Sequence, residues 1–527
     1  MKQDFDIAVA GSGFGGSLIA MIGRRLGRSV ILLERCKHPR FAMGESSTPL
    51  ANLLLEELGG RYDLPALASL SKWGAWQKAH PEIACGLKRG FTFYHHGWDR
   101  PFSDDSTRRR QLLVAASPRD EIADTHWYRA DFDHFLVRQA QEVGVDYVDE
   151  IAPHKLELNA QGVTVAGARH GKEFSVRAKF LIDATGPRGF VHRALNLPEL
   201  AFDHLPRTEG LYSHFTNVQR WDAIHPPAGV PPYPVDDAAL HHVFEGGWIW
   251  VLRFNNGITS AGVAATESVA RSLRLEEGAA AWERFLDRLP SVREQFREAK
   301  PAFDFVYARR LSFRSGAAAG PRWALLPSAA GFIDPLLSTG FALTLLGISR
   351  LARIIEQDWE SGRFAQGLNA YAAETFAELL AAERLVAALY ASMKDFGVFS
   401  LLSLLYFGAV SYAETARRLG RPDLAESFLL HKAGRFGSRL AQCCDWATRA
   451  SRKGCFTQEE KDEFQRNVFD AIAPLDSAGL CDRARRNWYP MKAEDLLAAA
   501  PKFGVDVAEI KGLLRRNGFV IPEGEAE

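Results

Sequence analysis

"FDIAVAGSGFGG", the stretch from Phe5 to Gly16, decides the fold of this chain. The largely apolar run 5–10 predicts a buried strand. Three glycines follow it at the spacing G-x-G-x-x-G and open a helix: Gly11, Gly13 and Gly16. A second apolar run, Val30 to Leu33, predicts the next strand. Strand, glycine turn, helix and strand form a βαβ unit, which predicts an α/β protein with a Rossmann-like first domain.

The glycine turn also predicts a dinucleotide site. Bare backbone at Gly13 lets a pyrophosphate approach, and the N–H groups at the start of the helix meet its negative charge. Glu34 ends the second strand, where a carboxylate can accept hydrogen bonds from ribose hydroxyls. The alternative is a tight turn that binds no ligand.

Composition excludes several classes of protein. Lys plus Arg and Asp plus Glu both number 64, so no overall charge recruits nucleic acid. The six cysteines form no C-x-x-C pair and the chain starts on a strand, which favours a reduced, cytoplasmic protein. The uncharged segment Phe396 to Ala413 is at the short limit for a membrane span, and we expect a buried core helix there.

Patterns further along the chain predict three regions. Short alternating strands precede "DATG", residues 200–300 mix Pro-rich loops with aromatic strands, and helical periodicity follows Phe341. The 527 residues therefore divide as follows. The dinucleotide-binding domain takes 1–75, 110–200 and 300–350, an inserted antiparallel, substrate-facing sheet region takes 76–109 and 201–299, and a helical carboxy-terminal region takes 351–527.

Arg129 stands just before a predicted helix in "WYRADFDHFL", and "DATG" ends a strand. This pairing resembles the FAD-binding fold of the para-hydroxybenzoate-hydroxylase type. The resemblance implies FAD, with Arg129 along the cofactor. It also implies a small turn beside the ADP half, formed by Ala184, Thr185 and Gly186. A simpler alternative is that Arg129 only pairs with Asp131 or Asp133.

The segment "GFIDPLLSTGFAL", Gly331 to Leu343, contains F-x-x-P-x-x-S-x-G and leads into an apolar helix. It resembles the signature of flavin-dependent halogenases. The resemblance places Asp334 and Pro335 beside the flavin. It also implies a chloride or bromide ion at the start of the helix, which suits an anion. The halide-binding residues would be Ser338, Thr339 and Gly340.

"GLKRGFTF", Gly86 to Phe93, resembles the lysine segment of the same family, and Lys88 falls on the catalytic position. An amine there can hydrogen-bond hypohalous acid or form its N-halo adduct. The alternative is a surface lysine. "GESSTP", from Gly44 to Pro49, resembles the family's loop over the flavin, which implies that Glu45 and Ser46 bind the cofactor.

Two positions depart from the family pattern. Leu337 stands where the tryptophan-acting members have a glutamate, so we expect the phenol-halogenating branch, in which the substrate's own hydroxyl activates the ring. The family's W-x-W-x-I-P box reads "WIWVLR" here. The substrate-shielding Trp248 and Trp250 are present, but Leu252 and Arg253 replace the Ile and Pro.

The resemblance implies a two-component halogenase of secondary metabolism. A separate NADH-dependent reductase supplies FADH2, and O2 with chloride or bromide yields hypohalous acid, which attacks a small phenolic or similar aromatic, free or tethered to a carrier protein. One alternative is an FAD-dependent aromatic monooxygenase, which the altered tryptophan box permits. Another is a flavoprotein that reduces a lipid or polyene double bond, or a silent carrier-protein-binding partner.

Overall fold

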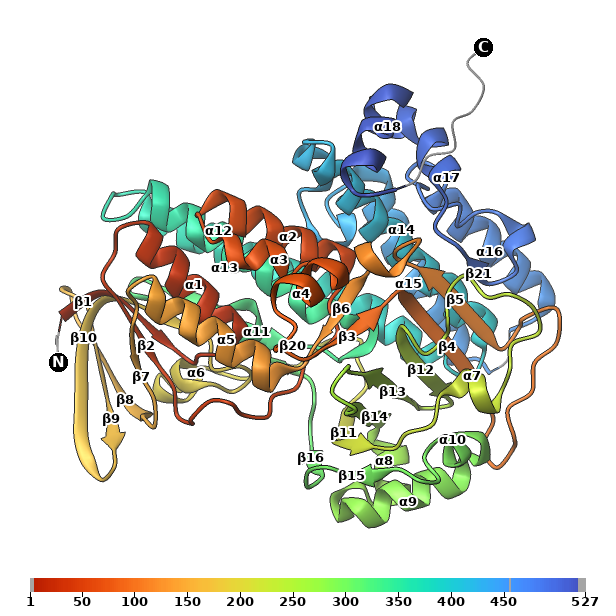
Figure 1. Ribbon diagram of the computed structural model, residues 1–527, viewed down its shortest axis with the longest axis horizontal. Helices are drawn as coiled ribbons and strands as arrows, with labels where there is room; N and C mark the ends of the chain where they lie inside the picture. Colours follow the sequence, from red (N-terminus) through yellow and green to blue (C-terminus); the bar gives the residue numbers. More distant parts are fainter. Residues whose placement is uncertain (1–3, 455, 520–527) are drawn as a thin grey trace.

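The computed structural model describes residues 4–454 and 456–519. Figure 1 shows two sheets at opposite ends of the molecule, with the amino terminus at the first sheet. Long helices run between the sheets, and the carboxy-terminal helices lie above the second sheet in this view. The five cysteines in the described part of the chain are free, and Cys455 lies outside it.

The first sheet confirms the predicted βαβ unit. Strand β1 (Asp4–Ala10) pairs in parallel with β2 (Val30–Leu33) on one side and with β10 (Lys172–Asp183) on the other. Helix α1 (Phe14–Arg25) crosses between β1 and β2. The order is β18-β19-β10-β1-β2-β7, with β7 at Asp146–Val148, β18 at Ala319–Gly320 and β19 at Trp323–Leu325. Apart from β18, which pairs antiparallel with β19, these strands are parallel, so their carboxyl ends face one edge of the sheet, where α/β folds bind ligands.

The predicted meander is built on β10. Its first half pairs antiparallel with β9 (Val163–Arg169), which pairs with β8 (Ala152–Leu158). Its second half, apolar and buried, joins the parallel sheet and ends at Asp183. One strand therefore belongs to both the meander and the Rossmann-like sheet.

The second sheet has nine strands in the described residues and is mainly antiparallel. Its order is β15-β11-β14-β13-β12-β4-β5-β21, and β16 pairs with β11. The strands are β4 (Gly90–His96), β5 (Gln111–Ala115), β11 (Thr208–Thr216), β12 (Ala239–Phe244), β13 (Gly247–Arg253), β14 (Thr259–Thr266), β15 (Lys300–Pro301), β16 (Val306–Ala308) and β21 (Trp488–Tyr489).

Three assignments of the sequence to regions differ from these pairings. β5 pairs with β4, although residues 110–115 were assigned to the dinucleotide-binding domain. β15 and β16 pair with β11 in this sheet, although 300–308 were assigned to the same domain. β21 comes from the carboxy-terminal region and pairs with β5. These boundaries depend on pairing between strands that are distant in the sequence. Local periodicity gives no information about such pairing.

Two small sheets lie between the large ones. β3 (Cys85–Lys88) pairs antiparallel with β6 (Asp124–Trp127), and β17 (Phe313–Arg314) pairs with β20 (Gly331–Phe332). In the first of these, Lys88 is directly opposite Asp124. Side chains directly opposite each other in an antiparallel pair lie on the same face, so these two side chains are neighbours.

Helices cover the sheets and fill the carboxy-terminal region. Those of the amino-terminal part are α2 (Pro49–Arg61), α3 (Pro65–Ser69), α4 (Trp73–Ala79), α5 (Arg129–Glu142), α6 (Phe190–Ala194), α7 (Trp221–Ile224), α8 (Glu267–Leu273), α9 (Ala279–Arg288), α10 (Pro290–Gln295) and α11 (Pro327–Ala330). The carboxy-terminal ones are α12 (Thr339–Gln357), α13 (Phe364–Ser392), α14 (Phe396–Arg418), α15 (Gly434–Ser451), α16 (Gln458–Ile472), α17 (Ala493–Ala498) and α18 (Val507–Arg516).

Two helical segments are apolar and long enough to cross a membrane by length and composition: Leu336–Gln357 and Phe396–Arg418. Their apolar windows are 67% and 83% buried within the protein. Core helices of this length pass the same test, and α14 packs in the interior as expected from its sequence.

Candidate active site

One large cavity, of about 830 Å³, lies where the glycine turn, the loop 40–46, strand β13 and the loop 331–341 meet. Most of the predicted site residues line it. These are Gly11, Gly13, Glu34, Glu45, Ser46, Arg129, Ala184, Thr185, Gly186, Trp248, Trp250, Asp334, Pro335, Ser338, Thr339 and Gly340. Gly16 and Lys88 are not among its lining residues. The large cavity therefore brings together segments that are up to 330 positions apart in the sequence.

The three glycines of the turn have different roles. A Cβ on Gly11 would lie 2.7 Å from the carbonyl oxygen of Ala184, and Gly11 has a φ of +93°. A Cβ on Gly16 would lie 1.8 Å from the carbonyl oxygen of Gly11, so Gly16 lets the helix pack on the turn. A Cβ on Gly13 would have no neighbour closer than 3.4 Å and would enter the large cavity. The space beside Gly13 is therefore left for a ligand.

The start of α1 leaves backbone donors free beside this space. Gly13 is the N-cap residue, and no side chain caps the helix. The first N–H groups of a helix lack partners within it and carry partial positive charge. They suit a pyrophosphate, as the sequence predicts.

Glu34 is held rigidly at the end of β2. Its Oε2 accepts hydrogen bonds from the N–H and hydroxyl of Ser12, both at 2.9 Å, and pairs with Arg40 at 3.2 Å. Its Oε1 accepts from the N–H of Cys36 at 3.1 Å. Burial alone would raise the pKa of Glu34, but Arg40 and the Ser12 donors lower it overall. The carboxylate therefore stays charged and fixed at the wall of the large cavity.

Arg129 ties two walls of the large cavity together. Its Nε and Nη2 donate to both oxygens of Asp133, at 2.8 and 2.7 Å. Its Nη1 donates to the carbonyls of Met43 and Gly44, at 2.9 and 2.8 Å. The pairing with Asp133 that the sequence left open is thus present, and the same guanidinium positions the loop that carries Glu45 and Ser46. The main role of Arg129 is therefore to hold two walls of the cavity in place.

The loop before α12 has an unusual backbone. Leu337 and Ser338 both have left-handed conformations, with φ of +64° and +54°, which costs energy for residues with a side chain. The hydroxyl of Tyr406 donates to the carbonyl of Leu337 at 2.8 Å and supports this geometry. No side chain caps the 19-residue helix α12. Its first N–H groups, at residues that line the large cavity, are therefore free to bind an anion.

Asp334 fixes Trp248, the first of the box tryptophans, against this loop. It accepts hydrogen bonds from Trp248 Nε1 at 3.2 Å, from the hydroxyl of Tyr390 at 2.9 Å and from the N–H of Leu336 at 3.0 Å. Burial raises the pKa of Asp334 to about 6. Trp250 donates to the hydroxyl of Ser260 at 3.2 Å. The indole groups are therefore held in place as part of the cavity wall.

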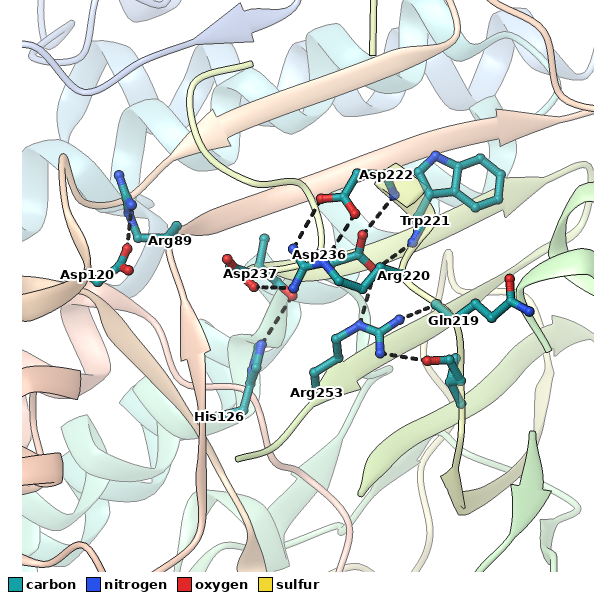
Figure 2. Close-up of polar contacts among 12 residues, drawn as sticks. Arg89, Asp120, His126, Gln219, Arg220, Trp221, Asp222, Asp236, Asp237 and Arg253 are labelled. Carbon is teal, nitrogen blue, oxygen red and sulfur yellow. Dashed lines mark hydrogen bonds and ion pairs between the residues drawn. The ribbon is translucent and has the colours of Figure 1, made fainter. Parts of the chain in front are cut away.

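The altered end of the tryptophan box has a structural explanation. Alternation along β13 puts Trp248, Trp250 and Leu252 on the large cavity and Arg253 on the opposite face. Figure 2 shows the Arg253 guanidinium between Asp236 and the carbonyl of Gln219. The ion pair with buried Asp236 measures 3.2 Å. Arg253 thus fastens the sheet to a neighbouring loop and leaves an apolar wall on the cavity.

Lys88 is fully buried behind the wall of the large cavity. Its Nζ donates to the hydroxyl of Ser46 at 2.8 Å and to the carbonyl of Ser47, and lies 3.9 Å from the ring centre of Phe91. Because Ser46 lines the cavity, one hydrogen bond separates it from Lys88. Burial lowers the pKa of Lys88, so the neutral amine is more accessible than in water. The alternative of a surface lysine is wrong.

Sequence reasoning missed two polar side chains at this site. Tyr390 reaches Asp334 from α13, and His214 on β11 contacts Glu45, with 2.7 Å between Nε2 and Oε1. Both come from segments whose local patterns only indicate core positions. No sequence signal distinguishes them from ordinary buried residues.

Comparison with known proteins agrees with this geometry. The family described as tryptophan halogenase matches residues 121–392, which is more than half of the chain. The chain belongs to this family of flavin-dependent halogenases. The matched region contains the box tryptophans and the loop before α12, and it ends at the last residue of α13.

Two characterised members of the halogenase family are 31% identical to this chain. They are tetracycline 7-halogenase of Kitasatospora aureofaciens, over 380 residues, and monodechloroaminopyrrolnitrin halogenase PrnC of Pseudomonas fluorescens, over 375 residues. Each alignment covers 69% of this chain, and 66% and 64% of the two relatives. The chain therefore matches about two thirds of the length of these relatives.

A crystal structure of halogenase PltM, in complex with phloroglucinol and FAD, superposes with a TM-score of 0.81 at 25% identity. The match covers 92% of this chain and 99% of that one. Most of the fold of this chain is thus shared with a halogenase of known structure.

Proposed function

We propose that this protein is a two-component halogenase that adds chloride or bromide to an electron-rich, phenolic aromatic through hypohalous acid. The observation that carries the proposal is the uncapped start of α12 at the same cavity as the glycine turn and the box tryptophans. That arrangement brings an anion site to a dinucleotide site behind an apolar wall. An anion partly stripped of water there is a better nucleophile than a hydrated one.

The residues of the large cavity fit FAD. The open space at Gly13 suits a pyrophosphate, Glu34 would accept from the ribose, and the loops 44–46 and 334–340 would flank the flavin ring. Bound as FADH2, the cofactor would supply the activation of O2. A separate NADH-dependent reductase would reduce it, and we propose a cytoplasmic location for both proteins.

The protein's own residues then divide the work. The N–H groups of Thr339 and Gly340 would bind the halide, and a Cβ on Gly340 would meet no atom within 4 Å, so there is room for an ion. Trp248 and Trp250 would keep the substrate from the flavin. Lys88, one hydrogen bond behind Ser46, would receive hypohalous acid from the large cavity.

Two observations support a phenolic substrate: the leucine at position 337 and the similarity to PltM. Leu337 is fully buried and lines neither of the two described cavities, so this position offers no carboxylate to deprotonate an unactivated ring. PltM was crystallised with phloroglucinol, a trihydroxybenzene. Two other relatives, at 23% and 25% identity, are named for pyrrole substrates on a peptidyl-carrier protein. The two relatives at 31% identity carry no such name, so we propose a free aromatic as substrate.

The second candidate function, an FAD-dependent monooxygenase, rested on the altered box. Because Arg253 lies on the face of β13 away from the cavity, the change leaves the shielding wall apolar. Mass spectrometry of a phenol panel incubated with the protein, FAD, a flavin reductase, NADH, O2 and bromide tests both functions. We expect products that gain bromine. A product that gains one oxygen and no bromine would overturn the proposed halogenase.

A further inference from the structure

A second, smaller cavity of about 60 Å³ is lined by Asp124, the residue directly opposite Lys88. Its walls come from α2, the loop 116–122, α14 and the carboxy-terminal α18. This volume is far below the roughly 300–1,000 Å³ of ordinary ligand pockets, so only part of a small ligand can enter it. Asp124, the cross-strand partner of Lys88, forms part of its wall.

Asp124, which lines this second cavity, carries an unpaired buried acceptor. It is only 7% exposed, and its Oδ1 accepts a hydrogen bond from Asn52 Nδ2 at 2.8 Å. Its Oδ2 has no hydrogen-bond partner, and neither has the amide oxygen of Asn52. A buried acceptor without a donor costs about 1–3 kcal/mol, so both atoms favour a ligand that donates hydrogen bonds.

Lys88 and Asp124 connect the linings of the two cavities. On one side, Lys88 donates to Ser46, which lines the large cavity. On the other side, Asp124 lines the second cavity. Both side chains are buried, and each charge acts on the other: Asp124 raises the pKa of Lys88, and Lys88 lowers the pKa of Asp124. A reagent that reaches Lys88 from the flavin side is thus next to the carboxylate that faces the other cavity.

The charges around Asp124 are mixed. Burial raises the pKa of Asp124, and Glu414 raises it further, whereas Lys88, the hydrogen bond from Asn52 and Arg418 lower it, with a net upward shift. Glu414 and Arg418 belong to α14 and line the same cavity, and they pair with each other at 2.7 Å. His126 follows on β6 and burial keeps its pKa well below the usual value, so it is neutral. A carboxylate with a raised pKa accepts a proton more readily than an exposed one.

We propose that Asp124 is the proton acceptor for the substrate's ring hydroxyl, which enters the second cavity, and that it replaces the carboxylate missing at position 337. This inference rests on the proposed halogenase function. It adds the residue, the cavity and the substrate class, a single aromatic ring bearing a hydroxyl group that can donate to Asp124 and Asn52.

The step balances as follows. Asp124 takes the hydroxyl proton as the ring carbon attacks the halogen of hypohalous acid, so a carbon–halogen bond forms and the oxygen–halogen bond breaks. The hydroxide that leaves takes the proton from Asp124 and becomes water. The hydrogen on the halogenated carbon is then lost as a proton, and the ring oxygen gains one, which restores the aromatic phenol. Hypohalous acid is the oxidant and is reduced to water and the carbon-bound halogen.

The test compares Asp124→Asn with wild type and with Glu121→Gln, a control in which an exposed carboxylate of the same loop is neutralised. Substrates are resorcinol and its dimethyl ether, 1,3-dimethoxybenzene, which keeps an electron-rich ring but has no hydroxyl proton. With resorcinol we expect Asp124→Asn to lower bromination by about 10²–10⁴-fold. With the ether we expect wild type and variant to differ little, and a diffusible trap should still detect hypobromous acid from the variant.

Two further measurements protect the test against a misfolded variant. Calorimetry with oxidised holoprotein should show weaker binding of phloroglucinol to Asp124→Asn and unchanged binding to Glu121→Gln. Asn52→Ala removes the hydrogen bond that lowers the pKa of Asp124, so the pH below which the resorcinol rate falls should move upward. A structural role for Asn52 would not move that pH.

The outcomes separate this inference from the proposed function. Wild-type bromination of resorcinol with equal bromination by Asp124→Asn would overturn the role of Asp124 alone. An equal loss with the dimethyl ether would also overturn it, because that ring has no hydroxyl proton to transfer. A wild-type product with added oxygen and no bromine would overturn the proposed halogenase instead.

Discussion

The two cavities whose linings Lys88 and Asp124 connect are built in different ways. The large cavity is made by backbone turns, at Gly11–Gly13, Ala184–Gly186 and Ser338–Gly340, each encoded by a short run of residues. The second cavity depends on side chains from α2, β6, α14 and α18, which meet only in the folded protein. On the functions proposed above, local sequence would encode cofactor and halide binding, whereas long-range packing would determine substrate binding.

Lys88 connects the linings of the two cavities with Asp124, and its removal should have the largest effect on product. We expect Lys88→Ala to lower bromination of resorcinol by about 10⁴-fold, the upper end for a single catalytic group. O2 uptake by the reduced holoprotein should continue, because the large cavity keeps its turns. An oxygen electrode and mass spectrometry on the same sample measure the two quantities.

Lys88→Met is the matched variant, since it keeps most of the buried volume beside Phe91 and removes only the amine. Full bromination by either variant would mean that Lys88 has only a structural role. The hypohalous acid would then reach the substrate without this amine.

Substrate choice should follow the second cavity. Because Leu337 provides no carboxylate and Asp124 faces a site for a hydroxyl, we expect wild type to brominate resorcinol about 10³-fold faster than free tryptophan. Competition between the two substrates in one reaction, read by mass spectrometry, gives the ratio directly. Comparable rates would mean that another group deprotonates the indole.

The cofactor side is tested by Gly13→Val. A side chain there would enter the space left for the pyrophosphate, while the nearest protein atoms, 3.4 Å or more from the new Cβ, leave the fold intact. We expect FAD to bind at least about a hundredfold more weakly, or about 3 kcal/mol, by equilibrium dialysis.

Gly60→Val is the control for Gly13→Val. Gly60 is an exposed glycine of α2 with no atom within 4 Å of a new Cβ, so this variant should bind FAD as the wild type does. Unchanged retention of FAD by Gly13→Val would mean that the glycine turn only connects β1 to α1.

The same contrast explains how much could be predicted from sequence. The βαβ unit, the meander and the loop before α12 follow from glycine spacing, alternation and a family signature, because each is fixed by neighbouring residues. Asp124 lies opposite Lys88 through a strand register that spans 36 positions, and Tyr390 reaches Asp334 from a helix. No local pattern reports such pairings, and β5 and β21 pair across the predicted region boundaries for the same reason.

The smallest effect is expected at Arg253. This residue stands where the family pattern has proline, and its side chain lies on the face of β13 away from the large cavity. Arg253→Met removes the ion pair with Asp236 and the hydrogen bonds to Val218 and Gln219. Because the Arg253 side chain is 21% exposed, we discount the cost of breaking a buried pair to about 1–2 kcal/mol. Thermal unfolding should show a fall in Tm of a few degrees, and exposed Arg309→Met should show none.

The ratio of brominated to oxygenated product should stay at the wild-type value in both variants, since neither side chain faces the large cavity. Oxygenated product from Arg253→Met alone would show that this arginine, and not the apolar face of β13, keeps the substrate away from the flavin.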